Sequence, residues 1–330
     1  MKFTEFIGID VSKSTIDVFI YGKKQYRRFA NLKSGLNQLI EWVKSQAECP
    51  VGNIMFAFEH TGLYSVPLSL YLDKGVYSFV VIPGLELKRS LGISRGKSDK
   101  TDARRIAEYA YEKKDKLKCH QMPSETILQL KRLASYRERL VKERTAFKCR
   151  IGEYKVFLNE DENSVLFDSH RKMIAGLNEQ INIIEKQIKK IIKQDEKLNE
   201  MYDLIISIKG VGPQTALMMI VLTNGFISFE SWRKFSSYSG IAPFPNESGK
   251  YKGKTQTNSL ANKRIKALLN QCATSAIQYN AEMRIYYQDR VNQGKNKMST
   301  LNNVRNKLLS RIFAVVERGT PYVETYKYAT

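Results

Sequence analysis

A regular repeat of isoleucine and leucine between residues 174 and 191 constrains the fold of this chain more than any other feature. Successive members are 3, 4, 3, 4 and 3 positions apart, and they are Ile174, Leu177, Ile181, Ile184, Ile188 and Ile191. This spacing is typical of a coiled-coil seam. A repeat of seven upstream connects Leu133, Leu140, Phe147 and Tyr154, and the polar stretch "LNEDENS" separates the two. We therefore predict two long helices within residues 119–203, paired as an antiparallel hairpin or serving as a dimerisation arm.

Residues 1–118 alternate between strand-like and helix-like segments. The segments "EFIGID" and "TIDVFIY" flank the turn-like "VSKS" and predict a hairpin, and "QYRRFA" predicts a third strand. The segments "NIMFAFE" and "YSFVVIP" predict two further strands, whereas "SGLNQLIEWVKSQ" has helical spacing. Antiparallel strands followed by strand–helix alternation predict an α/β domain, in which helices cover a mixed sheet.

Residues 204–330 are predicted to form a third, mainly helical domain. The stretch "IKGVGPQTA" has the Gly-x-Gly turn of a helix-hairpin-helix motif, in which backbone amides meet a phosphate. Lys209, Gly210 and Gly212 would lie at that phosphate, although a plain turn between core helices explains the stretch about as well. The aromatic residues that follow have helical spacing, which favours a core first and a base-stacking surface second; they are Phe226, Phe229, Trp232, Phe235 and Tyr238.

The balance of charges points to a polyanionic partner. The chain carries 54 lysine and arginine residues against 33 aspartate and glutamate residues, a formal net charge of +21. Nucleic acid is the first candidate for that partner, and an anionic membrane surface is the second. No apolar run approaches the roughly 20 residues of a membrane helix, and the N-terminus has no signal-peptide pattern. The four cysteines have no metal-binding or disulfide spacing, which is typical of a reduced, cytosolic protein.

The stretch "GKSDKTDARRIAEYA" (96–110) combines acidic and basic residues in a helical pattern. Ser98 is the expected N-cap of a helix that begins at Asp99. Asp99 and Asp102 extend the apolar face formed by Ala103, Ile106, Ala107 and Ala110, so both carboxylates are expected to point toward the sheet. The basic residues lie on the other side, where they would meet phosphates; they are Lys97, Lys100, Arg104 and Arg105.

Two further carboxylates are expected near this pair. Asp10 lies in the first predicted strand, where Gly8 leaves space beside it, and Glu59 ends an apolar strand at a strand-to-helix turn, a usual position for ligand sites in open α/β sheets. A buried group of carboxylates is costly unless a cation neutralises it. We therefore predict that Asp10, Glu59, Asp99 and Asp102 bind Mg²⁺, as two ions per site, with Mn²⁺ as the substitute. Asp17, Glu86 and Glu108 are expected to be surface charges.

Several motifs resemble those of one known family. "GIDVSK", "FEHTGLY" and "KSDKTDARRIAEYA" resemble the N-terminal RuvC-like domain of the DEDD-type insertion-sequence transposases, and "ISIKGVGPQTA", "FSSYSGIAP" and "NESGKYKGK" resemble the family's C-terminal domain. The resemblance covers nearly the whole chain. It implies a ribonuclease-H-like fold for residues 1–118, with Asp10, Glu59, Asp99 and Asp102 as the metal-binding tetrad. It also implies a C-terminal transposase domain over residues 204–330.

The resemblance further implies a nucleophilic serine, and Ser248 in "ESGK" matches its position. A serine that attacks a phosphodiester would keep the bond energy in a phosphoserine linkage, and the metal site must approach it, within one subunit or between two. Members of the family act as oligomers in the bacterial cytosol or nucleoid, so a dimer or tetramer through the coiled coil is expected. They act on donor and target DNA under the guidance of a structured RNA. The basic residues expected to contact nucleic acid in this domain are Lys209, Lys250, Lys252, Lys254, Lys263 and Arg264.

Three other functions remain open from the sequence. The chain could be a Holliday-junction-type metal-dependent nuclease that uses water as its nucleophile. It could be a non-catalytic nucleic-acid-binding protein. The stretch "GIDVSKSTIDV" also resembles the first phosphate loop of actin-like and sugar-kinase ATPases, although no second phosphate loop or adenosine motif accompanies it. Ser236, Ser237 and Ser239 are rivals to Ser248 as the nucleophile.

Overall fold

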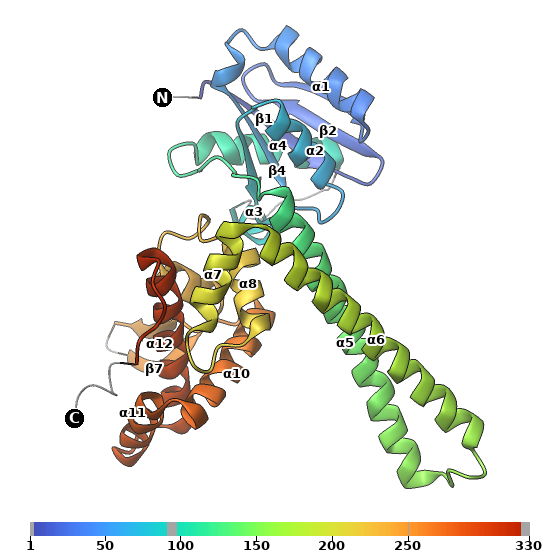
Figure 1. The fold of residues 1–330 in the computed structure, drawn as a ribbon. Helices are drawn as coiled ribbons and strands as arrows, with labels where there is room; N and C mark the ends of the chain where they lie inside the picture. The colour runs from blue at the N-terminus through green and yellow to red at the C-terminus, as the bar shows by residue number, and fades with distance from the viewer. Residues whose placement is uncertain (1–2, 91–97, 250, 325–330) are drawn as a thin grey trace. The chain divides into compact units, whose positions relative to one another are not determined.

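The computed structural model describes residues 3–90, 98–249 and 251–324. They form two compact units, Met1–Met122 and Pro123–Thr330 (Figure 1). The first unit corresponds to the predicted α/β domain, whose end we placed at residue 118. The second contains both the predicted helical arm and the predicted C-terminal domain.

The first unit is built on a five-stranded mixed sheet in which the strands lie in the order β3-β2-β1-β4-β5. The first three strands pair antiparallel, and β4 and β5 continue the sheet parallel to β1. The strands are β1 (Glu5–Val11), β2 (Thr15–Ile20), β3 (Gln25–Ala30), β4 (Ile54–Glu59) and β5 (Phe79–Ile82). All five were predicted from the sequence, as was the hairpin between β1 and β2.

Helices cover both faces of this sheet, because its strands alternate apolar side chains between two directions. On one face Ile7, Ile9 and Val11 pack with α1 and α2, and on the other Phe6 packs with α3 and α4. The helices are α1 (Lys33–Gln46), α2 (Val66–Lys74), α3 (Gly84–Ser90) and α4 (Asp99–Glu112), and a short 3₁₀ turn, Val51–Asn53, precedes β4. The α/β prediction for this part of the chain is confirmed.

The second unit begins with an antiparallel pair of long helices, α5 (Glu125–Phe157) and α6 (Ser164–Gln194). Cross-helix contacts fix their opposite directions. Arg137 pairs with Glu185 at 2.6 Å and Arg144 donates to Asn178 at 2.9 Å, while the Tyr154 and Phe167 rings meet near the hairpin turn. Figure 1 shows the two helices side by side. The predicted hairpin is confirmed, and its role as a dimerisation arm remains a prediction.

The rest of the second unit is a helical bundle with one β-hairpin. A single core joins the base of the long helices to the bundle, and Leu217, Phe235 and Leu308 are fully buried in it. Among the predicted core aromatics, Phe235 is buried, Trp232 is half-buried and Tyr238 is 40% exposed. The elements are α7 (Glu196–Ile206), α8 (Pro213–Thr223), α9 (Trp232–Tyr238), β6 (Pro243–Ser248), β7 (Tyr251–Thr257), α10 (Lys263–Tyr279), α11 (Ala281–Asn292) and α12 (Lys297–Arg318). Across the described ranges, no helix has both the length and the apolar character needed to cross a membrane.

Candidate functional site

The ends of two neighbouring parallel strands bring Asp10 and Glu59 together. In the pairing of β1 with β4, Ile9 lies opposite Phe58, so Asp10 and Glu59 occupy the next positions along the two strands. Both side chains are half-buried. The Glu59 carboxylate lies against Gly84 at the start of α3, where a Cβ atom would come within 2.0 Å of Oε1. The carboxyl edge of β1 and β4 therefore carries two acids, as the sequence predicted.

Gly8 allows α4 to pack directly on β1. A Cβ atom at this glycine would lie 2.1 Å from the carbonyl oxygen of Ala103 and 2.3 Å from the amide nitrogen of Ala107. Only a residue without a side chain permits backbones to come this close. The space that we expected beside Asp10 is thus occupied by the backbone of α4. This contact carries the first turn of α4, with its two aspartates, to the Asp10 edge of the sheet.

The N-cap and the apolar face of α4 agree with the prediction from its sequence. The Ser98 side chain accepts a hydrogen bond from the Thr101 amide, as an N-cap does. Ala103, Ile106, Ala107 and Ala110 are buried against the sheet. Asp102 is half-buried on the same face, as predicted. Asp99, one turn earlier, is exposed and pairs with Arg28, so the prediction that both carboxylates point toward the sheet is wrong for Asp99.

The electrostatic consequence of this assembly appears at Asp10. Burial, together with the negative charges of nearby carboxylates, raises the pKa of Asp10 from 3.8 to about 6; the carboxylates belong to Asp102, Asp99, Asp17 and Glu59. Desolvation and like charges both disfavour the ionised form. The charges of the three other predicted acids, and that of Asp17, therefore all act on Asp10.

Arginines already contact three of these acids. Arg28 on β3 donates to Asp17 at 2.8 Å and to Asp99 at 3.0 Å, and Arg105 pairs with Asp102 at 3.2 Å. Asp17 is only 1% exposed, and the Tyr26 hydroxyl also donates to it. Our interpretation of Asp17 as a surface charge was therefore wrong. Arg28 was not among the predicted site residues, and the strand period offered the only signal for it, since Asp17 and Arg28 pair directly across β2 and β3.

The acidic cluster does not form a ready-made metal site. Among the described residues, no three side chains of histidine, cysteine, aspartate or glutamate lie close enough to hold one ion. The donor set nevertheless suits a hard divalent cation, because it consists of carboxylate oxygens and because burial, together with the neighbouring carboxylate charges, raises the pKa of Asp10. Metal binding would require Asp99 and Asp102 to exchange their arginine partners for the cation.

Ser248 lies at the tip of the β6–β7 hairpin in the second unit. It ends β6, pairs with Tyr251 and is exposed. Gly249 follows with a φ of 57°, in the left-handed region that turns require and glycine adopts readily. Among the described residues, the Ser248 hydroxyl makes no hydrogen bond, so none of them activates it in this arrangement.

The base of this hairpin is tightly fixed. Gly240 has a φ of 67°, and a Cβ atom there would lie 2.2 Å from the Cβ of Ala261. Asn262 then caps α10 by accepting a hydrogen bond from the Ile265 amide. The segment "SGIAP" and the segment "ANKRIKALL" thus meet where the hairpin leaves the bundle.

The rival serines are less suitable nucleophiles. Ser236 and Ser239 are buried in the bundle, and their hydroxyls donate to Asn306 at 2.6 Å and to the Ser236 carbonyl at 3.1 Å. Ser237 is exposed on α9. Accessibility therefore leaves Ser248 and Ser237 as candidates, and Ser248 alone lies in a turn.

Some of the side chains predicted to contact nucleic acid already form ion pairs within the protein, and others do not. Lys97 and Lys250 lie outside the described residues. Arg104 pairs with Glu108, Lys209 with Glu324 and Arg264 with Glu138. Arg105 is half-buried and pairs with Asp102, so the prediction that it lies on the side of the helix away from the aspartates is wrong. Burial lowers the pKa of Arg264, whose guanidinium also donates to the Ala134 carbonyl and so ties α10 to α5. Of the predicted lysines inside the described ranges, four are exposed and form no ion pair there: Lys100, Lys252, Lys254 and Lys263. All these contacts remain predictions.

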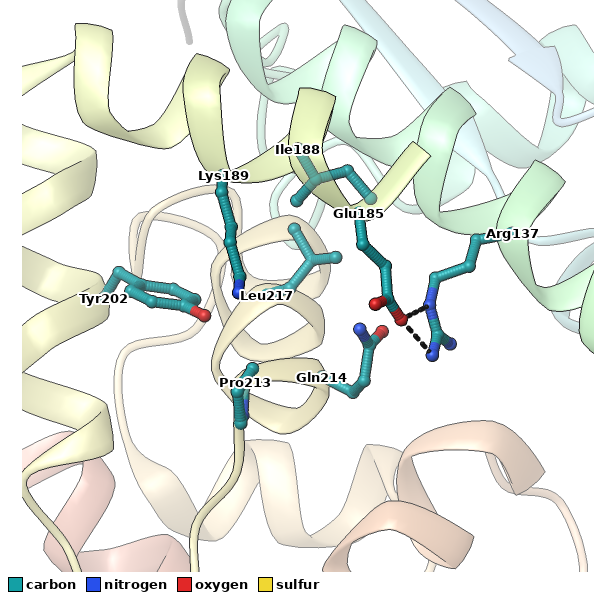
Figure 2. Close-up of a pocket in the computed structure, with 8 residues that line it drawn as sticks. All are labelled: Arg137, Glu185, Ile188, Lys189, Tyr202, Pro213, Gln214 and Leu217. Atoms are coloured by element: carbon teal, nitrogen blue, oxygen red, sulfur yellow. Dashed lines mark hydrogen bonds and ion pairs between the residues drawn. The ribbon is translucent and has the colours of Figure 1, made fainter. Parts of the chain in front are cut away.

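The "IKGVGPQTA" stretch forms the turn between α7 and α8. Gly210 has a φ of 96°, and a Cβ atom there would lie 2.8 Å from the α10 backbone at Ala276, so this glycine has a packing role. The beginning of α8 borders a cavity of about 220 Å³ between α5, α6, α7 and α8 (Figure 2). Figure 2 shows Glu185 and Arg137 paired at its edge, with Lys189 and Tyr202 on the opposite side. The Arg137 charge is therefore already neutralised.

Comparison with known proteins covers most of the chain. A family profile described as "Transposase" matches residues 7–154, and one described as "Transposase IS116/IS110/IS902 family" matches residues 202–288. The chain is 25% identical over 329 residues to the "Pilin gene-inverting protein" of Moraxella bovis, covering 96% of this chain and 97% of the relative. It is 23% identical over 158 residues to an uncharacterised IS110 protein of Streptomyces coelicolor, covering 48% of this chain and 38% of the relative.

Proposed function

Because the chain belongs to the IS110-type family of insertion-sequence transposases, we propose that it cuts and rejoins DNA through a serine nucleophile and an acidic metal site. Its relative in Moraxella bovis is named for inverting a gene, an outcome for which DNA strands must be both cut and rejoined. The gathering of four carboxylates around Asp10 carries the proposal.

We propose that the first unit has a ribonuclease-H-like fold. Three antiparallel strands that continue into two parallel strands, in the order β3-β2-β1-β4-β5, support it. So does the location of the acids at the ends of β1 and β4 and at the start of α4. In this arrangement Asp10, Glu59, Asp99 and Asp102 would hold Mg²⁺, which supplies charge stabilisation for phosphoryl transfer when it is bound.

The Ser248 hydroxyl would attack the phosphorus of one DNA phosphodiester. A bond forms between Oγ and phosphorus, one bond from phosphorus to a deoxyribose oxygen breaks, and the proton from Oγ ends on the departing hydroxyl. The number of phosphate ester bonds is unchanged, so the reverse attack by a DNA hydroxyl rejoins a strand without ATP. The exposed position of Ser248 at a hairpin tip gives DNA access to it.

A structured RNA is the proposed guide, with the chain acting as a dimer or tetramer. Support comes from the family's motifs and from the net charge of +21, which suits binding of more than one polyanion. Sequencing of RNA that co-purifies with the protein tests this part separately. Recovery of random RNA alone would contradict RNA guidance without contradicting DNA cutting and rejoining.

Covalent trapping tests the serine. The full chain is incubated with Mg²⁺ and DNA carrying both element ends, together with RNA from the same cells, and is then denatured. We expect a protein–DNA adduct that Ser248→Ala abolishes and that Ser237→Ala, a matched change at an exposed serine, retains. Cleavage that persists in Ser248→Ala without an adduct would indicate a water nucleophile. Full recombination by Asp10→Asn would indicate that the acidic site is not catalytic.

A further inference from the structure

A second cavity in the bundle is lined by aromatic and basic side chains. It has a volume of about 640 Å³, within the range of ligand pockets. α9 contributes Trp232, α11 contributes Tyr286, and both rings are half-buried. Its basic residues are Arg233, Arg290 and Lys307, and none of the described residues that line it is acidic.

The three cations of this cavity lie over its two rings. Arg233 is 5.1 Å from the centre of the Trp232 ring, and Arg290 and Lys307 are 5.7 and 4.4 Å from the centre of the Tyr286 ring. Within the part of the chain that the structure describes, none of the three forms an ion pair with a carboxylate. Their charge is therefore available to an anionic ligand.

The floor of the cavity is rigid. Ser236 donates to Asn306, whose amide in turn donates to the carbonyls of Ile241 at 3.1 Å and Asn302 at 3.0 Å. These bonds fix α9, the segment that leads into β6, and α12 relative to one another. A ligand would thus meet walls that are already in place, which reduces the entropy lost on binding.

The cavity in Figure 2 lacks this combination. There Glu185 neutralises Arg137, and Tyr202 is the single aromatic residue in the lining. The second cavity combines two aromatic rings with three cations that have no acidic partner among the described residues. This combination suits an unpaired nucleotide, because the base stacks on a ring face while the phosphate meets the cations. A base within a duplex has both of its faces covered by neighbouring bases, so neither face is free to stack on Trp232 or Tyr286.

We propose that the Trp232–Tyr286 cavity binds an unpaired nucleotide of single-stranded nucleic acid, with its base against Trp232 and its phosphates at Arg233, Arg290 and Lys307. Pro243 also lines the cavity and begins β6, which ends at Ser248. Five strand steps span roughly 17 Å. The bound nucleotide would therefore lie within a few nucleotides of a phosphodiester at Ser248, a consequence that rests on the proposed function.

Tryptophan fluorescence tests the proposal directly, because the chain has only Trp42 and Trp232. Trp42→Phe leaves Trp232 as the single reporter. The full-length variant is titrated with dT16, rU16, an abasic 16-mer of equal charge, and polyphosphate. We expect saturable quenching by the base-bearing strands and little by the abasic strand or polyphosphate. Quenching by either dT16 or rU16 supports the site, and the tighter strand identifies its source as DNA or RNA.

Substitutions separate stacking from general attraction. Tyr286→Ala should weaken dT16 or rU16 binding between about fivefold and 100-fold, whereas Tyr279→Ala, at an exposed tyrosine of α10, should not. Lys307→Gln should lower the slope of log affinity against log salt by about 0.7. Lys297→Gln, on the same helix but outside the cavity, should leave the slope unchanged.

Two results would overturn the proposal. One is equal quenching by the abasic strand or polyphosphate. The other is no quenching at strand concentrations that saturate binding in a gel-shift assay. Absence of any binding in both assays would remove the proposed function as well, whereas loss of cleavage in Ser248→Ala with quenching intact leaves the cavity's assignment standing.

Discussion

Replacing Asp10 by asparagine should make the first unit more stable at neutral pH. The substitution keeps the shape of the side chain and removes a charge that burial and four neighbouring carboxylates disfavour. If the site binds a cation, as we propose, the acid should reduce the stability of the metal-free protein. The effect should therefore depend on pH.

The magnitude follows from the pKa of Asp10, raised from 3.8 to about 6. Each pKa unit corresponds to about 1.4 kcal/mol, so the upper limit is about 3 kcal/mol. Solvent screening at this half-buried site reduces the expected gain to about 1–2 kcal/mol. Below pH 3.8 the carboxyl is protonated in both the folded and unfolded states and contributes nothing. As pH rises from about 4 to 6 the unfolded state loses its proton first, so wild-type stability falls, and the full difference is present above pH 6.

Trp42 reports on this unit because it lies on α1 and packs against Phe29. In a Trp232→Phe background, urea unfolding in EDTA is followed by its fluorescence from pH 4 to pH 8. The free-energy difference between Asp10→Asn and the parent should grow from near zero at pH 4 to about 1–2 kcal/mol at pH 7.5. Asp73→Asn, at an exposed acid of α2, is the matched control. A gain that does not change with pH, or no gain at pH 7.5, would refute the electrostatic reasoning.

Three further outcomes follow from the same unit and the same assay. Addition of Mg²⁺ should stabilise the parent at pH 8 more than at pH 5.5 and should leave the stability of Asp10→Asn nearly unchanged. Equal stabilisation of the parent and of Asp10→Asn would mean that the cation binds elsewhere. Arg28→Gln should lower the urea midpoint, because buried Asp17 loses a cation and keeps only the Tyr26 hydroxyl; an unchanged midpoint would mean that the Tyr26 hydroxyl alone satisfies Asp17. Gly8→Ala should cost about 3 kcal/mol or more, since its Cβ would lie 2.1 Å from the Ala103 carbonyl oxygen; an unchanged urea midpoint would contradict the close packing of α4.

Local sequence patterns predicted the helix and strands that carry the site, whereas pairing across the sheet determined which charged side chains contact one another. The apolar face of α4 and its Ser98 cap are local, so both could be recognised in one short stretch. The contact of Arg28 with Asp17 and Asp99 depends on the register of β2 with β3 and on where α4 begins, which lie about 70 positions apart in sequence. The alternation of side chains along β2 does not by itself predict which acid is buried, and Asp17 was therefore wrongly predicted to be a surface charge.

The second unit shows the same division. The seam of isoleucines predicted α5 and α6 because a coiled coil repeats its signal over many turns. The β6–β7 hairpin has exposed, polar strands, so no alternating pattern revealed it. The helical spacing of Trp232 favoured a position in the core. It is half-buried because Tyr286 and Arg290, distant in sequence, leave one side of it open to a cavity.

The arginines and the raised pKa at the acidic cluster are two responses to one problem. Five carboxylates interact at the edge of the sheet, and in the absence of a metal their charge is reduced by Arg28, by Arg105 and by easier protonation of Asp10. The Asp99–Arg28 pair is solvent-exposed and therefore weak, so exchanging that arginine for a divalent cation costs little. Asp17 differs, because it is buried and bonded by both Tyr26 and Arg28. We therefore expect Asp17 to keep its arginine when Asp99 releases it, so that Arg28 remains anchored beside the site as a cation available to a DNA phosphate.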